Sequence, residues 1–491
     1  MATTMNYLQL LQLALPECIV VVTALAVLTI GLTSGRAADL ASGVAAVGLV
    51  AAAAAVGGLP ANAFLFDGML VVTPLTSLFK IICLALALFT VVLARAGNFT
   101  RHAAEYVGMI LLATVGLMLL VGTEELLMIF IGLELTGLSL YVITAFDRDD
   151  RSSAEAGVKY FLFGSISSAF TLFGLSLVYG MCGSTSLNTI GQNIAAGPVA
   201  PLLAAGIVMT LVGLAFKIAA APFHLWAPEA YTGAPVPSAA FIASGSKVAS
   251  FVVLGKILLV GFAHAEGNAG WQQLSAGWAP LIALLAALSI VIGNLAALAQ
   301  TNVRRLLAYS AVAHAGYTLL GLLAGGREGF GATLFYTTTY AFTLLGAFGV
   351  VALVRREAGG DDFAHFARLR SHSPLLAGCM AVFMLSLAGL PPLAGFFGKF
   401  YLFSAALSAG ENQGLLWLVA LALFGSLISL YYYLLVLKVI FIDAAAPGQA
   451  ADVPARLDAM QRITVAVLAA IVLGLGVLPS ALLGRIAAAL P

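Results

Sequence analysis

Residues 211–248 read LVGLAFKIAAAPFHLWAPEAYTGAPVPSAAFIASGSKV. The apolar runs of this stretch suit a lipid environment, yet it contains Lys217, His224 and Lys247 together with four prolines. A charged side chain at the centre of a bilayer costs roughly 2.5–3.5 kcal/mol on insertion scales. The stretch therefore predicts membrane helices in which each ionisable group has a specific reason to be present.

The composition of the whole chain indicates the same class. Hydrophobic residues make up 62% and charged residues 9% of the 491 residues, whereas a soluble chain carries about 25% charged residues. The net charge of +1 gives no basic surface, so no nucleic-acid partner is expected. The four cysteines lie far apart in apolar runs without metal-ligand spacing, so neither a metal site nor a disulfide is expected. The predicted class is an all-α polytopic membrane protein.

Apolar runs long enough to cross a bilayer, about 20 residues each, occur fourteen times. The expected spans are 8–32, 40–60, 73–95, 106–122, 125–146, 153–182, 201–225, 234–262, 279–300, 304–325, 329–354, 375–403, 413–440 and 462–487. The spans near 234 and 375 are longer than a bilayer requires and are interrupted, which indicates tilt or breaks.

The arginines predict the orientation of these spans. Thirteen arginines fall in the loops that follow odd-numbered spans, and two (Arg327 and Arg485) fall elsewhere. The thirteen are Arg36, Arg95, Arg101, Arg148, Arg151, Arg304, Arg305, Arg355, Arg356, Arg368, Arg370, Arg456 and Arg462. Because basic residues are retained on the cytoplasmic side, the odd loops are predicted to be cytoplasmic and both termini to lie outside.

Lysine and arginine are sorted differently along the chain. All fifteen arginines lie in loops or at helix ends, whereas all seven lysines lie inside the apolar segments. Lysine can lose its proton and arginine in practice cannot. Lys217, Lys247 and Lys399 are too far from helix ends for easy snorkelling, so we expect them to handle protons. Lys256 and Lys438 are close enough to helix ends to snorkel, and Lys80 is undecided between the two roles.

One acid lies in the middle of a span. Glu134 has apolar neighbours, and the following span opens with Ser152 and Glu155 at the spacing of a capping box. At 1.5 Å per residue, Lys159 then lies about 10 Å and Glu134 about 18 Å below the cytoplasmic helix end. Two long side chains could bridge this gap, as a proton-handling pair or as a structural ion pair. Glu124 and Glu125, at a helix junction, are expected to be solvated.

Two histidines complete the titratable groups inside the spans. His224 follows Lys217 by seven residues, which on a continuous helix would place both on one face. His224 is therefore a candidate relay group, and His314 is a secondary candidate alongside Lys438.

The interruptions of the spans lie beside the lysines. Pro222 follows Lys217 by five residues, and Pro391 and Pro392 precede Lys399. Small residues surround Lys247 in ASGSKVAS. Broken spans seven and twelve are five apart, so spans 4–8 and 9–13 are predicted to be inverted five-helix repeats, as in transporters. The corresponding organisation is 1–105 (three helices), 106–262 and 263–442 (the repeats) and 443–491 (a C-terminal helix), with Glu134 matching His314 and Lys247 matching Lys438.

At these residues the sequence resembles the antiporter-like membrane subunits of respiratory complex I, the proton-pumping NADH:quinone oxidoreductase. The resemblance covers nearly the whole chain and also extends to Mrp-type cation/proton antiporters. It is carried by IGLELTGLSLYVITAF, AEAGVKYFLFGSISSAFTLFGLSLVYG, FKIAAAPFHLWAPEAYTGAPVPSAAFIASGSK, NVRRLLAYSAVAHAGYTLLG and LAGLPPLAGFFGKFYLF. Within this family the sequence resembles the branch called N in three features. It has lysine at position 399, it lacks a long C-terminal extension, and it has fourteen expected spans.

The resemblance implies roles for the matching positions. Glu134 would pair with Lys159, and protons entering from the cytoplasm would pass along Lys217, His224 and Lys247. Lys399 would lead to the outer exit.

The resemblance also implies partners and a location. The driving force would come from other membrane-arm subunits and from partner chains that hold NADH, FMN, iron–sulfur clusters and quinone, with no cofactor bound by this chain. The location would be the bacterial inner membrane. Two alternatives stay open: a subunit of an Mrp-type Na⁺/H⁺ antiporter, or an inactive spacer between neighbouring subunits.

Overall fold

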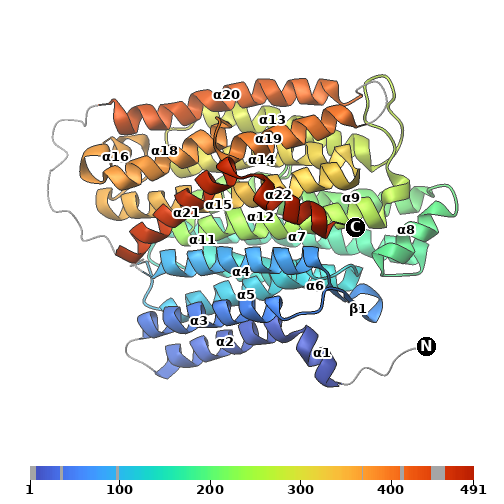
Figure 1. The fold of residues 1–491 in the computed structure, drawn as a ribbon, viewed down its shortest axis with the longest axis horizontal. Coiled ribbons are helices and arrows are strands. Elements are labelled where there is room, and N and C mark those ends of the chain that lie inside the picture. The colour runs from blue at the N-terminus through green and yellow to red at the C-terminus, as the bar shows by residue number, and fades with distance from the viewer. Residues whose placement is uncertain are drawn as a thin grey trace.

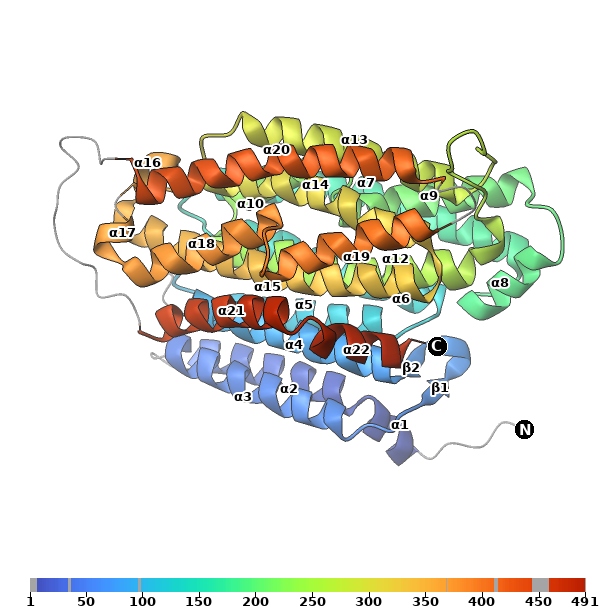
Figure 2. The ribbon, with the colours of Figure 1, turned by 45° about the horizontal axis from the view of Figure 1, so that its top comes forward.

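The computed structural model describes residues 7–33, 37–95, 99–367, 369–409, 414–443 and 459–490. These residues form one bundle of long helices that lie side by side along a common direction (Figure 1). Turned by 45°, α2 and α3 form one edge of the bundle, and α13 and α20 lie together at the opposite edge (Figure 2). Arg36, Arg368 and Arg456, which contribute to the predicted orientation, lie outside the described residues.

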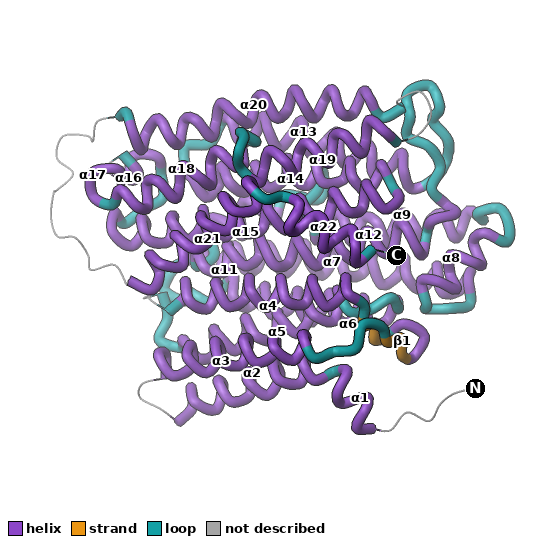
Figure 3. Tube along the Cα trace, in the orientation of Figure 1, coloured by secondary structure: helices purple, strands orange, loops and turns teal. Residues whose placement is uncertain are grey.

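The N-terminal part is helical apart from one short hairpin. Its helices are α1 (Tyr7–Leu13), α2 (Leu15–Thr33), α3 (Ala37–Gly57), α4 (Pro74–Ala94), α5 (Ala103–Val121), α6 (Leu126–Thr144), α7 (Arg151–Cys182) and α8 (Leu187–Ala195). Strands β1 (Ala63–Leu65) and β2 (Leu70–Val72) pair antiparallel around the 3₁₀ turn η1 (Phe66–Gly68). The strands stand out in orange against the helices (Figure 3).

The remaining elements include several short or irregular helices. They are α9 (Pro201–Lys217), α10 (Trp226–Gly233), α11 (Val236–Phe241), η2 (Ile242–Ser246), α12 (Lys247–Lys256), η3 (Ile257–Gly261), η4 (Ala263–Ala265), α13 (Trp278–Leu298), α14 (Val303–Ala324), α15 (Gly326–Ala358), α16 (Phe363–Phe366), α17 (Leu369–His372), α18 (Pro374–Ala388), α19 (Ala394–Ser408), α20 (Leu416–Phe441), α21 (Ala459–Val477) and α22 (Ser480–Ala489). Elements η2 and η3 are π-helical, so the segment 236–261 is one continuous span with two widened turns.

Within the described residues, twelve helices are long and apolar enough to cross a membrane by themselves. The predicted spans seven and twelve are not among them. The helix of span seven, α9, already ends at Lys217, and α10 follows the break beyond the predicted end at residue 225; span twelve is divided into α18 and α19. The predicted polytopic all-α architecture and the two breaks are therefore confirmed. The predicted start of span six was wrong: Asp150, not Ser152, caps α7, accepting a hydrogen bond from the Ser152 N–H at 2.8 Å.

Three spans occupy the centre of the bundle. The segment 236–261, α14 and α15 are each 94% buried over their apolar windows, whereas α2 and α3 are 33% buried. A helix that is apolar on all sides can be buried on all sides, and these three also carry many of the buried hydroxyl groups. The central position of these spans determines where the titratable residues meet.

Candidate functional site

Lys217 is the last residue of α9, at the first break. The backbone turns at Ala219, which has φ 57°, and the helical path resumes at Trp226. Groups freed by the break find partners, since the Ala221 N–H donates to Ser289 Oγ at 2.8 Å and the Trp226 indole N–H donates to Phe216 O at 3.0 Å. Irregular backbone in a membrane requires such partners, so the break is an ordered feature that holds Lys217 in place.

The Lys217 ammonium faces α6 on the side that carries Glu134. Its Nζ lies 3.5 Å from Tyr141 Oη, and a Cβ on Gly137 would lie 3.1 Å from the same Nζ. Gly137 thus allows the close approach, one helical turn from Glu134. A cavity of about 10 Å³ adjoins Lys217 and is also lined by Ser246 and Ser250 of the central span. That volume is close to the space of one water molecule.

Glu134 and Lys159 do not contact each other directly in this structure, so a direct ion pair between them was a wrong expectation. Glu134 accepts a hydrogen bond from the hydroxyl of Ser168. Ser168 follows Lys159 by nine residues on α7, a separation of about 13.5 Å along the helix axis. Lys159 instead contacts Glu155 at 2.6 Å and Glu229 at 2.9 Å.

Glu229 is a charged partner that the sequence did not reveal. It lies on α10, and its carboxylate also contacts Arg305 Nη1 at 3.3 Å. Because α10 is positioned by the break that precedes it, nothing in the local sequence around Lys159 pointed to Glu229. The expected pair is replaced by a cluster that joins α7, α10 and α14.

His224 lies between α9 and α10, so it does not continue the helical face of Lys217 as expected. The helix ends at Lys217, and the seven-residue spacing has no helical meaning beyond that point. The buried ring of His224 lies edge-on to Tyr309 of α14, with centroids 6.4 Å apart. His224 therefore connects the first break to the central helix α14.

Lys247 begins α12 directly after the π-helical turn η2. The residue is 2% exposed and belongs to a fully helical segment. Its Nζ donates to Ala311 O of α14 at 2.8 Å and lies 5.9 Å from the ring centre of Tyr340. The predicted central lysine is thus fully enclosed and directed toward α14 and α15.

His314 is surrounded by tyrosines in the middle of the bundle. Tyr336 Oη lies 2.6 Å from Nδ1, and Tyr433 Oη lies 3.0 Å from Nε2. The Tyr433 hydroxyl also contacts Ser310, and the Tyr340 ring stacks on the imidazole with centroids 4.8 Å apart. Both ring nitrogens therefore have hydroxyl partners, as a proton relay requires. The sequence around His314 gives no sign of these tyrosines, since they come from α15 and α20.

Lys399 lies on α19, beyond the second break, and reaches back across it. Its Nζ donates to Ala388 O, at the end of α18, at 3.1 Å and to Ser426 Oγ at 2.9 Å. It also lies 5.3 Å from the ring centre of Tyr317. Lys217 and the ammonium of Lys399 thus both lie at the C-terminal end of a half-helix, where the backbone carries partial negative charge.

Lys438 and Lys256 contrast with each other. Lys438 is 56% exposed and lies 3.6 Å from Asp443, apart from the central groups. Its position at the end of α20 agrees with snorkelling and does not bring it to the other site residues.

Lys256 is buried and paired, so the prediction that it snorkels was wrong. Glu125 is also buried, against the expectation of a solvated junction.

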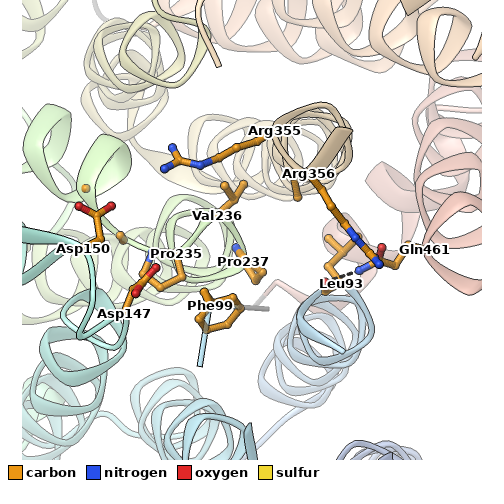
Figure 4. A pocket seen from close by; sticks show the side chains of 13 residues that line it. Leu93, Phe99, Asp147, Asp150, Pro235, Val236, Pro237, Arg355, Arg356 and Gln461 are labelled. Atoms are coloured by element: carbon orange, nitrogen blue, oxygen red, sulfur yellow. Dashed lines mark hydrogen bonds between the residues drawn. The ribbon is translucent and has the colours of Figure 1, made fainter. Parts of the chain in front are cut away.

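A larger cavity opens at the end of the bundle where the predicted cytoplasmic loops meet. It measures about 250 Å³. Its lining comes from the loops that follow the predicted spans three, five and seven, and from the ends of α15 and α21. Figure 4 shows Asp147 and Asp150 on one side, and Arg355 and Arg356 on the other. Pro235 and Pro237, at the start of the central span, also line it, so the cavity gives access to the top of that span.

Comparison with known proteins identifies the family. The family described as NADH:quinone oxidoreductase/Mrp antiporter, TM, matches residues 123–429. The chain belongs to this family. The match contains all six primary candidate residues, Glu134, Lys159, Lys217, His224, Lys247 and Lys399, whereas Lys438 lies beyond it.

Relatives in the NADH:quinone oxidoreductase/Mrp antiporter family match almost the whole chain. NADH-quinone oxidoreductase subunit N 2 of Acidobacterium capsulatum is 46% identical, over 97% of this chain and 98% of that protein. NADH-quinone oxidoreductase subunit N of Desulforamulus reducens is 40% identical, over 84% and 83%.

Solved structures of the family have the same fold. A chain of respiratory complex I from Thermus thermophilus is 34% identical, with a TM-score of 0.78 over 96% of this chain and 100% of that chain. A chain of the Mrp complex from Dietzia sp. DQ12-45-1b is 21% identical, with a TM-score of 0.82 over 97% of each chain. The second comparison concerns the fold alone.

Proposed function

We propose that this chain is the proton-translocating membrane-arm subunit N of an NADH:quinone oxidoreductase. The observation that carries the proposal is a series of ionisable groups in and beside the central spans, of which Lys217, Lys247, His314 and Lys399 are buried and Glu134 is half-buried. Glu134 contacts α7, Lys217 contacts α6 and Lys247 contacts α14. His314 contacts α15 and α20, and Lys399 contacts α18 and α20. Family membership and the two named relatives support the assignment.

The contacts suggest an order for proton transfer. The small cavity beside Lys217 reaches Ser246 and Ser250, next to Lys247. Lys247 contacts α14 at Ala311, and His314 is one helical turn further along α14. Tyr317, on the same helix, faces Lys399. Lys247 and Lys399 each donate to a backbone carbonyl, and Lys217 lies beside the Tyr141 hydroxyl, so these contacts stabilise the charged form without a fixed counter-ion and the proton remains transferable.

The chain itself supplies the proton path and not the energy. The driving reaction belongs to partner chains, which in such a complex hold NADH, FMN, iron–sulfur clusters and quinone. Other membrane subunits of the complex and the lipid bilayer are the expected partners. The proposed location is the bacterial inner membrane, with both termini on the outer side and the large cavity of Figure 4 on the cytoplasmic side as the uptake vestibule.

The spans 4–8 and 9–13 are proposed to be inverted repeats. The pair of breaks supports this relation, because a lysine is associated with each: Lys217 is the last residue of the half-helix α9, and the Lys399 ammonium contacts the last residue of the half-helix α18. The first repeat would then load protons at Lys217 and the second would release them at Lys399.

The decisive experiment is Lys217→Arg in the assembled complex, reconstituted into vesicles. Arginine keeps the charge but holds its proton, and loss of one acid–base group slows its own step by about 10²–10⁴-fold. Proton pumping coupled to NADH oxidation should fall strongly while assembly is preserved. Lys438→Arg, at an exposed position, is the matched control and should pump normally. Normal pumping by Lys217→Arg would contradict the proposal.

An Mrp-type Na⁺/H⁺ antiporter subunit is the second candidate, favoured by the fold shared with the Dietzia complex. Cation-driven proton flux through vesicles containing this chain, without NADH or quinone, would support that candidate. An inactive spacer predicts instead that Lys217→Ala and Glu134→Ala complexes assemble and pump normally.

A further inference from the structure

A second group of buried charges lies at the opposite end of the bundle from the cavity of Figure 4, and the proposed path does not use it. Its centre is Lys256, the last residue of α12. The Nζ atom donates to Val121 O at 3.0 Å and to Thr123 O at 3.1 Å, and it lies 3.7 Å from Glu124 Oε1. The side chain is 5% exposed, so Lys256 does not itself reach solvent.

Glu124 connects this lysine to the surface. Its side chain is 19% exposed and accepts a hydrogen bond from Asn188 Nδ2 at 3.4 Å in an exposed setting. The backbone of Glu124 is fixed, because its N–H donates to Gly68 O at 2.8 Å. A buried ammonium and a partly exposed carboxylate are therefore held close together on an ordered turn.

Lys80 and Glu17 lie on the other side of the same turn. They form an ion pair at 2.6 Å, with side chains 1% and 9% exposed. A Cβ on Gly122 would lie 3.3 Å from Lys80 Nζ, so Lys80 approaches the same end of α5 that Lys256 caps. Two buried lysines thus meet at one turn, where Glu17 balances Lys80 and Glu124 faces Lys256.

The small cavity beside Lys217 is lined by residues of α5 and α12, the two helices that end at this group. Leu120 and Ser250 line the cavity together with Lys217. Leu120 precedes Val121, whose carbonyl accepts from Lys256. Ser250 precedes Lys256 by six residues on α12, a distance of about 9 Å along the helix. The cavity beside Lys217 is thus bordered by the same two helices, α5 and α12, whose ends meet at Lys256.

We propose that Lys256 and Glu124 form a separate proton outlet of the first repeat, an inference that rests on the proposed function. In the release step one N–H bond of the Lys256 ammonium breaks and an O–H bond forms on the Glu124 carboxylate. Glu124 then gives that proton to solvent at the predicted outer surface. The neutral amine of Lys256 regains a proton from the Lys217 side, and no electron is transferred.

A purely structural role is the competing explanation, because a cation that caps the last carbonyls of α5 stabilises that helix. Lys256→Arg separates the two. Arginine retains the charge and can donate to Val121 O and Thr123 O, but it holds its proton. The complex carrying Lys256→Arg should assemble normally and lose proton pumping per NADH oxidised by about twofold or more, since loss of an acid–base group slows its own step by about 10²–10⁴-fold.

Three comparisons make the result decisive. If Lys256→Arg pumps normally while Lys217→Arg does not, the outlet is rejected and the proposed function stands. If Lys217→Arg also pumps normally, the proposed function fails with it. Should Lys256→Arg fail to assemble, Glu124→Gln decides: it keeps an acceptor for Asn188 but binds no proton at neutral pH, and normal pumping by that variant rejects the outlet.

Discussion

The Lys399 ammonium lies 3.1 Å from the carbonyl oxygen of Ala388, eleven residues earlier in the chain and across a helix break. The backbone of Lys399 belongs to the half-helix α19, and its ammonium contacts the last turn of the half-helix α18. Its charge therefore depends on the geometry of the break more than on any acidic partner. This relationship explains why prolines and a lysine occur together in a membrane span.

Gly389→Ala should disturb this arrangement. Gly389 has φ 85°, and a Cβ there would lie 3.0 Å from Lys399 Cδ. The left-handed backbone costs a non-glycine residue about 1–2 kcal/mol, and the added methyl displaces the lysine. We expect a lower thermal midpoint of the complex and reduced proton pumping. Gly378→Ala is the control, because a Cβ there meets no atom within 4 Å.

Tyr433→Phe should weaken the relay at His314. The substitution removes the hydroxyl that contacts Nε2 at 3.0 Å and Ser310, with little change in volume. Loss of a buried hydrogen-bond partner costs about 1–3 kcal/mol of stability. Fewer protons should be pumped, either because NADH oxidation is no longer coupled to pumping or because NADH oxidation itself slows. Tyr431→Phe, on the same helix and 60% exposed, should leave pumping unchanged. Equal pumping by the two variants would remove His314 from the path.

Asp361→Asn should destabilise the predicted cytoplasmic end in a pH-dependent way. Burial alone would raise the pKa of Asp361, but Arg304, Asn302 and Arg355 together hold the pKa below its usual range. A depressed folded pKa contributes stability above the unfolded value of about 3.9, and that contribution is lost as the pH falls through the folded pKa.

The measurement is the thermal midpoint of the purified complex as a function of pH. At pH 7 the thermal midpoint of the asparagine variant should be lower than that of wild type. The loss in the free energy of unfolding should be about 3–5 kcal/mol, the usual cost of breaking a buried ion pair. The difference from wild type should shrink toward acidic pH. Asp362→Asn, at an exposed neighbour, is the control. A difference that does not change with pH would show that the carboxylate charge is not the cause.

The Lys159–Glu229 pair should behave as a surface interaction. Its side chains are 39% and 32% exposed, and exposed pairs contribute about 0.2–1 kcal/mol in double-mutant cycles. A cycle of Lys159→Ala and Glu229→Ala should give a coupling free energy in that range, far below that of Arg304 and Asp361. A coupling above about 3 kcal/mol would contradict this expectation and indicate a buried pair.

Much of the site follows from the amino-acid sequence. The different placement of lysine and arginine singled out Lys217, Lys247 and Lys399 as candidates, because lysine can lose its proton and arginine in practice cannot. The proline positions identified both breaks, since proline cannot continue a helical hydrogen-bond ladder. These inferences depend on chemistry that is local to a residue or to one helix.

The partners of these residues could not be predicted in the same way. Glu229 beside Lys159, Ser168 beside Glu134 and the tyrosines around His314 all come from other helices. Lys256 was predicted to snorkel from its distance to a helix end, but the end of α5 and the turn at Gly122 cover it. The distance of a residue from the end of its own helix does not predict which other helices cover that residue.

The sequence by itself determined that the chain is a polytopic helical membrane protein, where its helices break and which side chains are the candidates for proton exchange. The reason is that the cost of burying charge and the covalent limits of proline act on single residues. Only the tertiary structure decided which ionisable groups meet, because those contacts depend on how the breaks position α10 and α18 against the central spans. A shift in helix register or a rotation of one element would pair the same residues differently.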